Sequence, residues 1–237
     1  MGFNFCGIAL SLTSETFRFD ILKMSINKRG LVDYVVSQLN VFFPDSNKTE
    51  NKIILSYIDK VLERVEYCFS FVNNRYFFNG KSILFNHLHA DQYAMFLYFL
   101  SHALFKEEGK QDICTKIFYL NKCLHSIDAF YEVELPDIFL FVHPVGTVLG
   151  RGKYSNYFLV YQRCNVGSNK EIYPTLKKYV SLHPGASILG NCLVEKNCKI
   201  SAGSLLMDTS LEENSIYIGN PDNYKIKEST NKIEIWK

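Results

Sequence analysis

An aliphatic residue recurs every six positions through much of the second half of the sequence. One series runs forward from Leu176 to Leu206, and another runs backward from Val166 to Val142. A small residue usually follows four positions after each aliphatic. Ten of the eleven positions hold Leu, Ile or Val: Val142, Val148, Tyr154, Val160, Val166, Leu176, Leu182, Ile188, Val194, Ile200 and Leu206.

A six-residue period fits neither an α-helix, with about 3.6 residues per turn, nor a simple alternating strand. It fits a triangular coil in which each hexapeptide forms one flat side, with its aliphatic inward and its small residue near a corner. Successive coils then stack and extend one core. The pattern therefore predicts an α+β chain that ends in a parallel β-helix of hexapeptide repeats. The alternative is a coincidence among the short strands of a β-sandwich.

The two series are out of phase, because Val166 and Leu176 are ten residues apart. About four residues within Gly167–Thr175 must therefore leave the coil as a loop. Insertions in solenoids often gather on a binding face. We therefore single out this loop as a candidate binding element.

The first half has the mixed three- and four-residue spacing of apolar residues that is typical of helices. Asp91 is expected to cap one of these helices at its N-terminus. Residues 1–130 are predicted to form a helical domain, 131–221 the β-helix and 222–237 a C-terminal tail, with Pro221 ending the last coil. The predicted helices span residues 30–43, 51–72, 91–105 and 112–130.

Composition and charge exclude several classes of protein. The net charge of +2 gives no electrostatic basis for binding nucleic acid. Apolar runs such as Tyr93–Leu100 are shorter than the roughly 20 residues of a membrane span. The opening MGFNFCGIALSLTS lacks the basic region of a signal peptide. Seven cysteines without a CxxC motif indicate reduced thiols, so we expect a cytoplasmic protein without an integral membrane segment.

Three segments of the second half resemble serine acetyltransferases of the hexapeptide acyltransferase superfamily: VHPVGTVLG, FLVYQRCNVGSN and YPTLKKYVSLHPGASILGNCLVEKNCKISAGSLL. The resemblance covers roughly Glu132–Asn220 and is greatest to the branch found in bacterial surface-polysaccharide gene clusters. It implies that the coils form a left-handed β-helix. It also implies a homotrimer or a dimer of trimers, with the active site between adjacent subunits. It also implies acetyl-CoA as co-substrate, bound along the groove between neighbouring coils.

The resemblance implies that His143, in HPVGTVLG, is the catalytic base. A hydroxyl is a poor nucleophile at neutral pH, so a neutral imidazole must take its proton as it attacks a thioester. An acidic residue orients this histidine in the family. The similar stretch here makes Glu134 the candidate, with Glu132 and Asp137 as substitutes. A structural histidine at a coil corner is the alternative for His143.

The residues implied to bind the acceptor are Val142 and Tyr173. In the family, these regions carry Asp before the histidine and Arg-His before a proline, whereas this chain has Val142 and the pair Ile172-Tyr173. Those charges are of the type that holds a zwitterionic amino acid. Their absence favours a neutral hydroxyl acceptor such as a sugar over serine.

The resemblance places the acetyl-CoA contacts at Gly167, Lys199 and Ala202. Ala202 lies where the groove must admit the pantetheine arm, and Lys199 is a candidate for phosphate contact. Lys225 and Lys227 are further candidates, although exposed lysines on a solenoid are usually just solvated.

No metal is expected. His87, His89 and Asp91 lie together at the start of a predicted helix, where capping and packing explain them better than metal binding.

The sequence thus favours an acetyl-CoA-dependent O-acetyltransferase acting on a small-molecule or sugar acceptor, with a sugar of a surface polysaccharide preferred. Serine O-acetylation and N-acetylation of an amino sugar are alternatives within the same fold. A non-catalytic trimeric scaffold is the alternative from another class, because solenoids present long flat surfaces.

Overall fold

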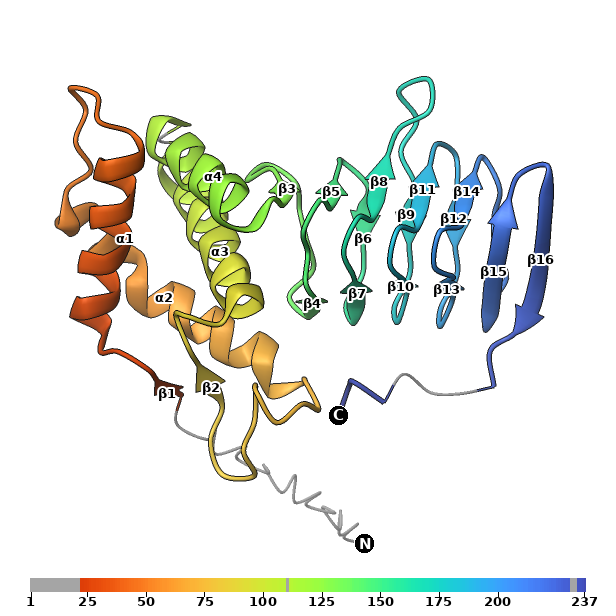
Figure 1. The fold of residues 1–237 in the computed structure, drawn as a ribbon, viewed down its shortest axis with the longest axis horizontal. Helices are drawn as coiled ribbons and strands as arrows, with labels where there is room; N and C mark the ends of the chain where they lie inside the picture. Colours follow the sequence, from red (N-terminus) through yellow and green to blue (C-terminus); the bar gives the residue numbers. More distant parts are fainter. Residues whose placement is uncertain (1–21, 110, 231–233) are drawn as a thin grey trace, which may run out of the picture.

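The computed structural model describes residues 22–109, 111–230 and 234–237. The opening segment considered as a signal peptide, and Cys6 within it, lie outside these residues. Helices gather at one end of the described chain, and a solenoid of short strands extends away from them (Figure 1). A short parallel pair, β1 (Lys23–Met24) and β2 (Leu84–Phe85), lies beside the helices.

Four α-helices form the first part of the described chain: α1 (Lys28–Phe42), α2 (Asn51–Ser70), α3 (Ala90–Glu108) and α4 (Gln111–His125). Apolar residues of α1 from Leu31 to Leu39 form one buried face, whereas α3 is buried on nearly all sides between Tyr93 and Leu104. Gly109 ends α3 in the left-handed conformation that glycine adopts without strain. In the described residues, no helix is long and apolar enough to cross a membrane.

The last helix is shorter than predicted. It ends at His125 rather than near residue 130, because Ser126 has φ 54° and the chain then enters the first strand of the solenoid, at Asp128–Ala129.

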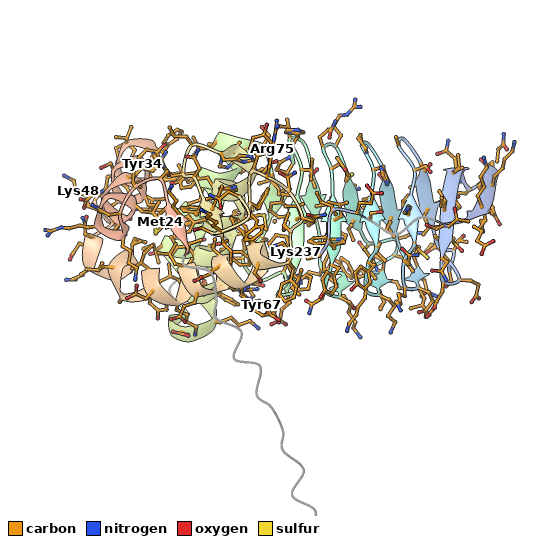
Figure 2. All side chains as sticks on the ribbon, turned by 90° about the horizontal axis from the view of Figure 1, so that it is seen from below. Met24, Tyr34, Lys48, Tyr67, Arg75 and Lys237 are labelled. Atoms are coloured by element: carbon orange, nitrogen blue, oxygen red, sulfur yellow. The ribbon has the colours of Figure 1, made fainter. Side chains whose placement is uncertain are left out.

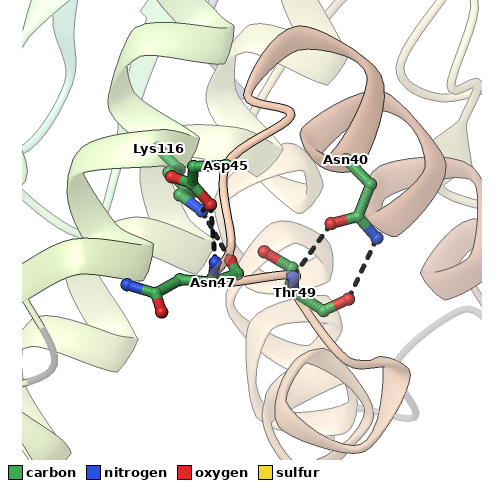
Figure 3. Close-up of polar contacts among 5 residues, drawn as sticks. All are labelled: Asn40, Asp45, Asn47, Thr49 and Lys116. Atoms are coloured by element: carbon green, nitrogen blue, oxygen red, sulfur yellow. Dashed lines mark hydrogen bonds and ion pairs between the residues drawn. The ribbon is translucent and has the colours of Figure 1, made fainter.

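Hydrogen bonds hold the polar connection between α1 and α2 in place (Figure 3). Asn40 and Thr49 exchange two bonds of 2.9 and 3.1 Å between the amide side chain and the backbone. Lys116 of α4 donates to the Asp45 carboxylate and to the Asn47 carbonyl, each at 2.7 Å. The connection is therefore fixed to α4 by side-chain bonds as well as by packing.

Three parallel sheets form the faces of the solenoid, and most coils add one strand to each. The first sheet contains β4 (Phe139–Phe141), β7 (Phe158–Val160), β10 (Ser181–Leu182), β13 (Lys199–Ile200), β15 (Ser215–Asn220) and the antiparallel β16 (Asn223–Glu228). The second contains β3 (Asp128–Ala129), β5 (Val148–Leu149), β8 (Asn165–Gly167), β11 (Ser187–Leu189) and β14 (Leu205–Met207). The third contains β6 (Lys153–Tyr154), β9 (Thr175–Leu176) and β12 (Leu193–Val194). This parallel β-solenoid of about five turns confirms the predicted architecture.

The turns between sheets form three edges that run along the solenoid. The first edge, between the first and second sheets, comprises residues 142–147, 161–164, 183–186 and 201–204. The second edge, between the second and third sheets, comprises residues 150–152, 168–174, 190–192 and 208–210. The third edge, which leads back to the first sheet, comprises residues 155–157, 177–180, 195–198 and 212–214.

The six-residue register is confirmed from Val160 onward, where all eight predicted positions are buried. It is wrong in the first coil. Val148 is 43% exposed, and the neighbouring Leu149 is buried and pairs with Val166 instead. Val142 is only half-buried, and Phe141 occupies the inward position opposite Val160.

The error arises from the length of one turn. Phe141 and Leu149 are eight residues apart, whereas the equivalent Leu182 and Ile188 are six apart. The first turn of the first edge therefore holds two extra residues. His143 lies in this lengthened turn.

The second-edge loop, residues 168–174, leaves the coil as predicted (Figure 1, between β8 and β9). The backbones of Asn169 and Ile172 exchange hydrogen bonds of 3.1 and 3.0 Å. Between them, Lys170 and Glu171 have φ of 50° and 63°, the pattern of a type I′ turn. The loop is thus a small ordered hairpin.

The C-terminal residues return to the helical region. After Pro221 the chain reverses into β16, which pairs antiparallel with β15 and extends the first sheet by one exposed strand. Trp236 is buried, bridges to Val72 and packs edge-on against Tyr157. Lys237 lies where helices and solenoid meet (Figure 2), and its N–H donates to the Phe71 carbonyl at 2.9 Å.

Candidate active site

His143 projects from the lengthened turn on the first edge. Its side chain is 78% exposed, and its backbone has φ 49°, a left-handed conformation that is uncommon outside glycine and asparagine. Its backbone N–H donates to Asp91 Oδ1 at 3.0 Å. The turn thus presents an accessible imidazole, while a hydrogen bond to Asp91 of α3 holds its backbone in place.

Asp91 lies in the first turn of α3 and is buried. It does not cap the helix as expected, because the N-cap residue is His89 and the carboxylate bonds to His143 instead. Its Oδ2 lies 4.0 Å from His143 Nδ1. Burial raises the pKa of Asp91, and the bond from His143 partly opposes that rise. A small movement of the imidazole would bring the two side chains into hydrogen-bonding distance.

Glu134, the acid predicted to orient His143, lies elsewhere. It pairs with Lys106 at 2.5 Å, and this bond lowers the pKa of Glu134. Lys106 is near the end of α3 and Asp91 near its start, about 22 Å apart along the helix at 1.5 Å per residue. The carboxylate beside His143 is therefore that of Asp91 and not that of Glu134. Of the two substitutes, Glu132 faces Arg151 at 3.4 Å and Asp137 is exposed ahead of β4.

Other residues of the first edge line up along the solenoid beyond His143. Tyr161 and His183 occupy equivalent positions on adjacent coils and stack with ring centroids 5.4 Å apart. Burial lowers the pKa of His183, and the nearby Lys199 adds to that effect. Ala202 is exposed and lies one coil beyond His183. The hydrogen bond from the Gly203 N–H to the Pro184 carbonyl joins these two coils.

Three of the predicted residues therefore share the first edge: Val142, His143 and Ala202. Lys199 lies just before this edge, in β13.

The remaining two predicted residues, Gly167 and Tyr173, lie at the second edge. Gly167 ends β8, and a Cβ there would be 3.2 Å from Leu189 Cδ2, so a larger residue would press on the next coil. Tyr173 is 39% exposed at the base of the second-edge loop, with its ring beside Gly150. Within one chain, Tyr173 and His143 are therefore not neighbours, because they lie on different edges of the solenoid.

The other candidate ligands are dispersed. His87 Nδ1 bonds to Ser25 Oγ at 2.7 Å, and His89 packs against Tyr76 and Phe77, so neither joins Asp91 around a common point. In the part of the chain that the structure describes, no three His, Cys, Asp or Glu residues gather as a metal site. A cavity of about 720 Å³ lies at the third edge beside Tyr179 and Trp236, away from His143.

Solved structures of serine acetyltransferases are similar to this chain. The enzyme from Brucella abortus strain S19 has a TM-score of 0.65 and 18% identity, over 86% of this chain and 84% of that chain. The fold is that of the serine acetyltransferases. The enzyme from Vibrio cholerae O1 biovar El Tor N16961 has a TM-score of 0.66 and 15% identity, over 87% of this chain and 81% of that chain.

A complex of the Brucella abortus serine acetyltransferase with coenzyme A also matches, with a TM-score of 0.65 and 17% identity over 87% of this chain and 84% of that chain. No protein-family model and no curated protein match the sequence. At such low identity the serine acetyltransferase fold is shared, whereas the acceptor must be argued from the side chains.

Proposed function

We propose that this protein is an acetyl-CoA-dependent O-acetyltransferase in which His143 is the general base. The supporting observation is the pairing of an exposed imidazole with a buried carboxylate, Asp91, on the fold of the serine acetyltransferases. A carboxylate behind an imidazole fixes its orientation and stabilises the protonated form during proton transfer.

The reaction is direct transfer. The imidazole takes the proton from the acceptor hydroxyl as its oxygen attacks the thioester carbonyl. The tetrahedral adduct then collapses, the C–S bond breaks, and the thiolate of coenzyme A takes the proton back from His143. The products are an acetyl ester and free coenzyme A, and no covalent enzyme intermediate forms.

Acetyl-CoA is proposed to lie along the first edge, where the small side chain of Ala202 projects little from the surface. Lys199 approaches this edge from β13 and is the proposed contact for a phosphate. The similarity to a coenzyme A complex supports this class of donor. Gly167, at the second edge, is proposed to face the donor from a neighbouring chain.

The active site is proposed to form between chains of a homotrimer. His143 and Tyr173 lie on different edges of one solenoid, so they share a site only if the first edge of one chain meets the second edge of another. A cyclic trimer of three-sided solenoids makes that contact at each of its interfaces. A dimer of trimers would keep the same sites.

The acceptor is proposed to be a neutral hydroxyl compound, with a sugar of a surface polysaccharide as first choice. Val142 beside the base and Ile172-Tyr173 on the loop supply apolar and aromatic surface without charge. A zwitterion is better held by charged groups. Serine is the alternative acceptor, and an amino sugar would give N-acetylation instead.

A thiol-release assay with acetyl-CoA tests the proposal against serine, free sugars, amino sugars and nucleotide sugars. The decisive variant is His143→Asn, because asparagine tolerates a positive φ but has no basic nitrogen. His87→Ala is the control, since it removes a histidine of the helical region that bonds to Ser25.

Turnover that is lost in His143→Asn, with coenzyme A binding retained in calorimetry, would support the mechanism and identify the acceptor class. Full turnover in His143→Asn would rule out His143 as the base. Neither turnover nor coenzyme A binding by the wild type would favour the non-catalytic scaffold.

A further inference from the structure

A single carboxylate ties the second-edge loop to the coils beyond it. Asp208 lies in the turn after β14, and its Oδ2 accepts a hydrogen bond from Asn169 Nδ2 at 2.5 Å. Its Oδ1 accepts from the backbone N–H of Asn191 at 2.8 Å. These two bonds lower the pKa of Asp208. The carboxylate therefore bridges three consecutive turns of the second edge.

The intervening turn leaves space for this carboxylate. Gly190 has φ 80°, and a Cβ there would lie 2.1 Å from Asp208 Oδ1 and 2.7 Å from Asn169 Cβ. Any side chain at this position would displace both partners. Gly190 thus permits the contact between Asp208 and Asn169.

Fixing Asn169 also fixes the rest of the loop. Its backbone exchanges two hydrogen bonds with Ile172, so the side-chain bond to Asp208 anchors one side of the hairpin. The next residue is Tyr173, which lies at the base of the loop. Surface loops are usually more mobile than the elements they connect, whereas these bonds hold this loop in one arrangement.

We propose that Asp208 is a positioning residue that holds the second-edge loop in the geometry that contacts the acceptor. The inference rests on the proposed function, in which Tyr173 reaches the acceptor bound beside His143 of a neighbouring chain. Asp208 itself touches neither substrate. It sets acceptor affinity through Asn169 and the hairpin.

The test compares Asp208→Ala, which removes both bonds, with Asp208→Asn, whose amide can still bond to Asn169 and Asn191. The matched control is Asn197→Ala. Asn197, like Asp208, has a positive φ, here 58°, and its side chain bonds across coils to Asn214 at 2.8 Å. It lies at the third edge rather than the second. Loss of this bond should not affect the second-edge loop.

Hydrogen exchange of the Asn169 and Ile172 amides, and tryptic cleavage after Lys170, report on the loop without any need for activity. Exchange and cleavage should accelerate about tenfold in Asp208→Ala, the effect of losing roughly one charge-assisted hydrogen bond. They should stay near wild type in Asp208→Asn and in Asn197→Ala. Unchanged exchange in Asp208→Ala would overturn the inference.

Steady-state kinetics then test the link to the acceptor. In Asp208→Ala, the KM for the acceptor should rise about fivefold to tenfold, while kcat and the KM for acetyl-CoA stay unchanged and Asp208→Asn behaves like wild type. Faster exchange with an unchanged acceptor KM would overturn the loop's role in acceptor binding. If the wild type acetylates no acceptor, the proposed function and that role fall together. The anchoring of the loop is judged by exchange alone.

Discussion

The Asp91 carboxylate and the His143 backbone N–H are joined by a 3.0 Å hydrogen bond across 52 residues of sequence. Asp91 lies in the first turn of α3, and His143 lies in the lengthened turn of the first coil. The bond therefore connects the helical region directly to the proposed base. This gives the helices a role in the site beyond covering the end of the solenoid.

Replacement of Asp91 should separate its two contributions. Asp91→Asn keeps an acceptor for the His143 N–H but removes the charge, so kcat should fall about a hundredfold, the low end of general-base effects. Asp91→Ala also leaves that N–H unpaired, which costs about 1–3 kcal/mol. Thiol release and thermal unfolding check both. A melting temperature equally low in the two variants would contradict this division.

The pH dependence of stability should reveal the buried carboxyl of Asp91. Burial raises the pKa of Asp91 in the folded protein, whereas an Asp in the unfolded chain has a pKa of about 4. The folded state therefore takes up a proton at higher pH than the unfolded state does. The resulting stabilisation is absent at high pH, appears as pH falls through the folded-state pKa, and is complete below about pH 4. Urea unfolding should show wild type gaining stability relative to Asp91→Asn as pH falls, and a constant difference would disprove this.

Glu134 should be dispensable for catalysis. It pairs with Lys106, which is near the end of α3 opposite to Asp91, and its side chain is largely exposed. Glu134→Gln should therefore change stability by no more than about 1 kcal/mol, the usual range for an exposed ion pair. Its kcat should remain that of the wild type in the thiol-release assay. A large loss of kcat without unfolding would return Glu134 to the site.

Mixed oligomers should show whether one site uses two chains. His143→Asn removes the base and Tyr173→Ala alters the loop, so each variant alone should be defective at low acceptor concentration. Co-expressed in equal amounts, about one quarter of the interfaces of a cyclic oligomer would combine an intact base with an intact loop. Activity near that fraction is expected from the purified mixture. No recovery would indicate that the two residues do not share a site.

The C-terminal contact should contribute strongly to stability. Trp236 is 7% exposed and packs on Tyr157, so Trp236→Ala should destabilise the fold by about 3 kcal/mol. Lys237→Ala is the control, since its ammonium lies over the Phe78 ring and contributes about 1 kcal/mol or less. Trp236 is the single tryptophan, so its fluorescence reports docking directly. Emission typical of an exposed indole in the native protein would contradict the contact.

The sequence was sufficient for the architecture because the six-residue period is repeated coil after coil. It also located the second-edge loop, since a break in the period can be read without any knowledge of contacts. It failed at Val142 and Val148, where a turn two residues longer looked like one more regular hexapeptide. Phe141 and Leu149, which take the inward positions, are as apolar as Val142 and Val148. The residue types therefore could not distinguish the two registers.

The carboxylate beside His143 could not be found in the same way. The resemblance to serine acetyltransferases pointed to Glu134, nine residues before His143, whereas the observed contact comes from Asp91 in the first turn of α3. The position of Asp91 in a first helical turn suggested a cap, and nothing in the sequence pairs it with a turn so far away. Contacts of this kind depend on how the helices dock, which periodicity does not encode.

The returning C-terminal segment also limits the length of the solenoid. Repeat proteins usually gain or lose coils freely, because each coil touches only its neighbours. Here Ser229 bonds to Asn214 on the last turn of the third edge, while Trp236 rests on Tyr157, on the first turn of that edge. These turns are about 14 Å apart at roughly 4.8 Å per coil. Seven residues reach at most about 25 Å. Each added coil would lengthen the path from Ser229 to Trp236 by about 4.8 Å, so the docking of Trp236 is coupled to the number of coils.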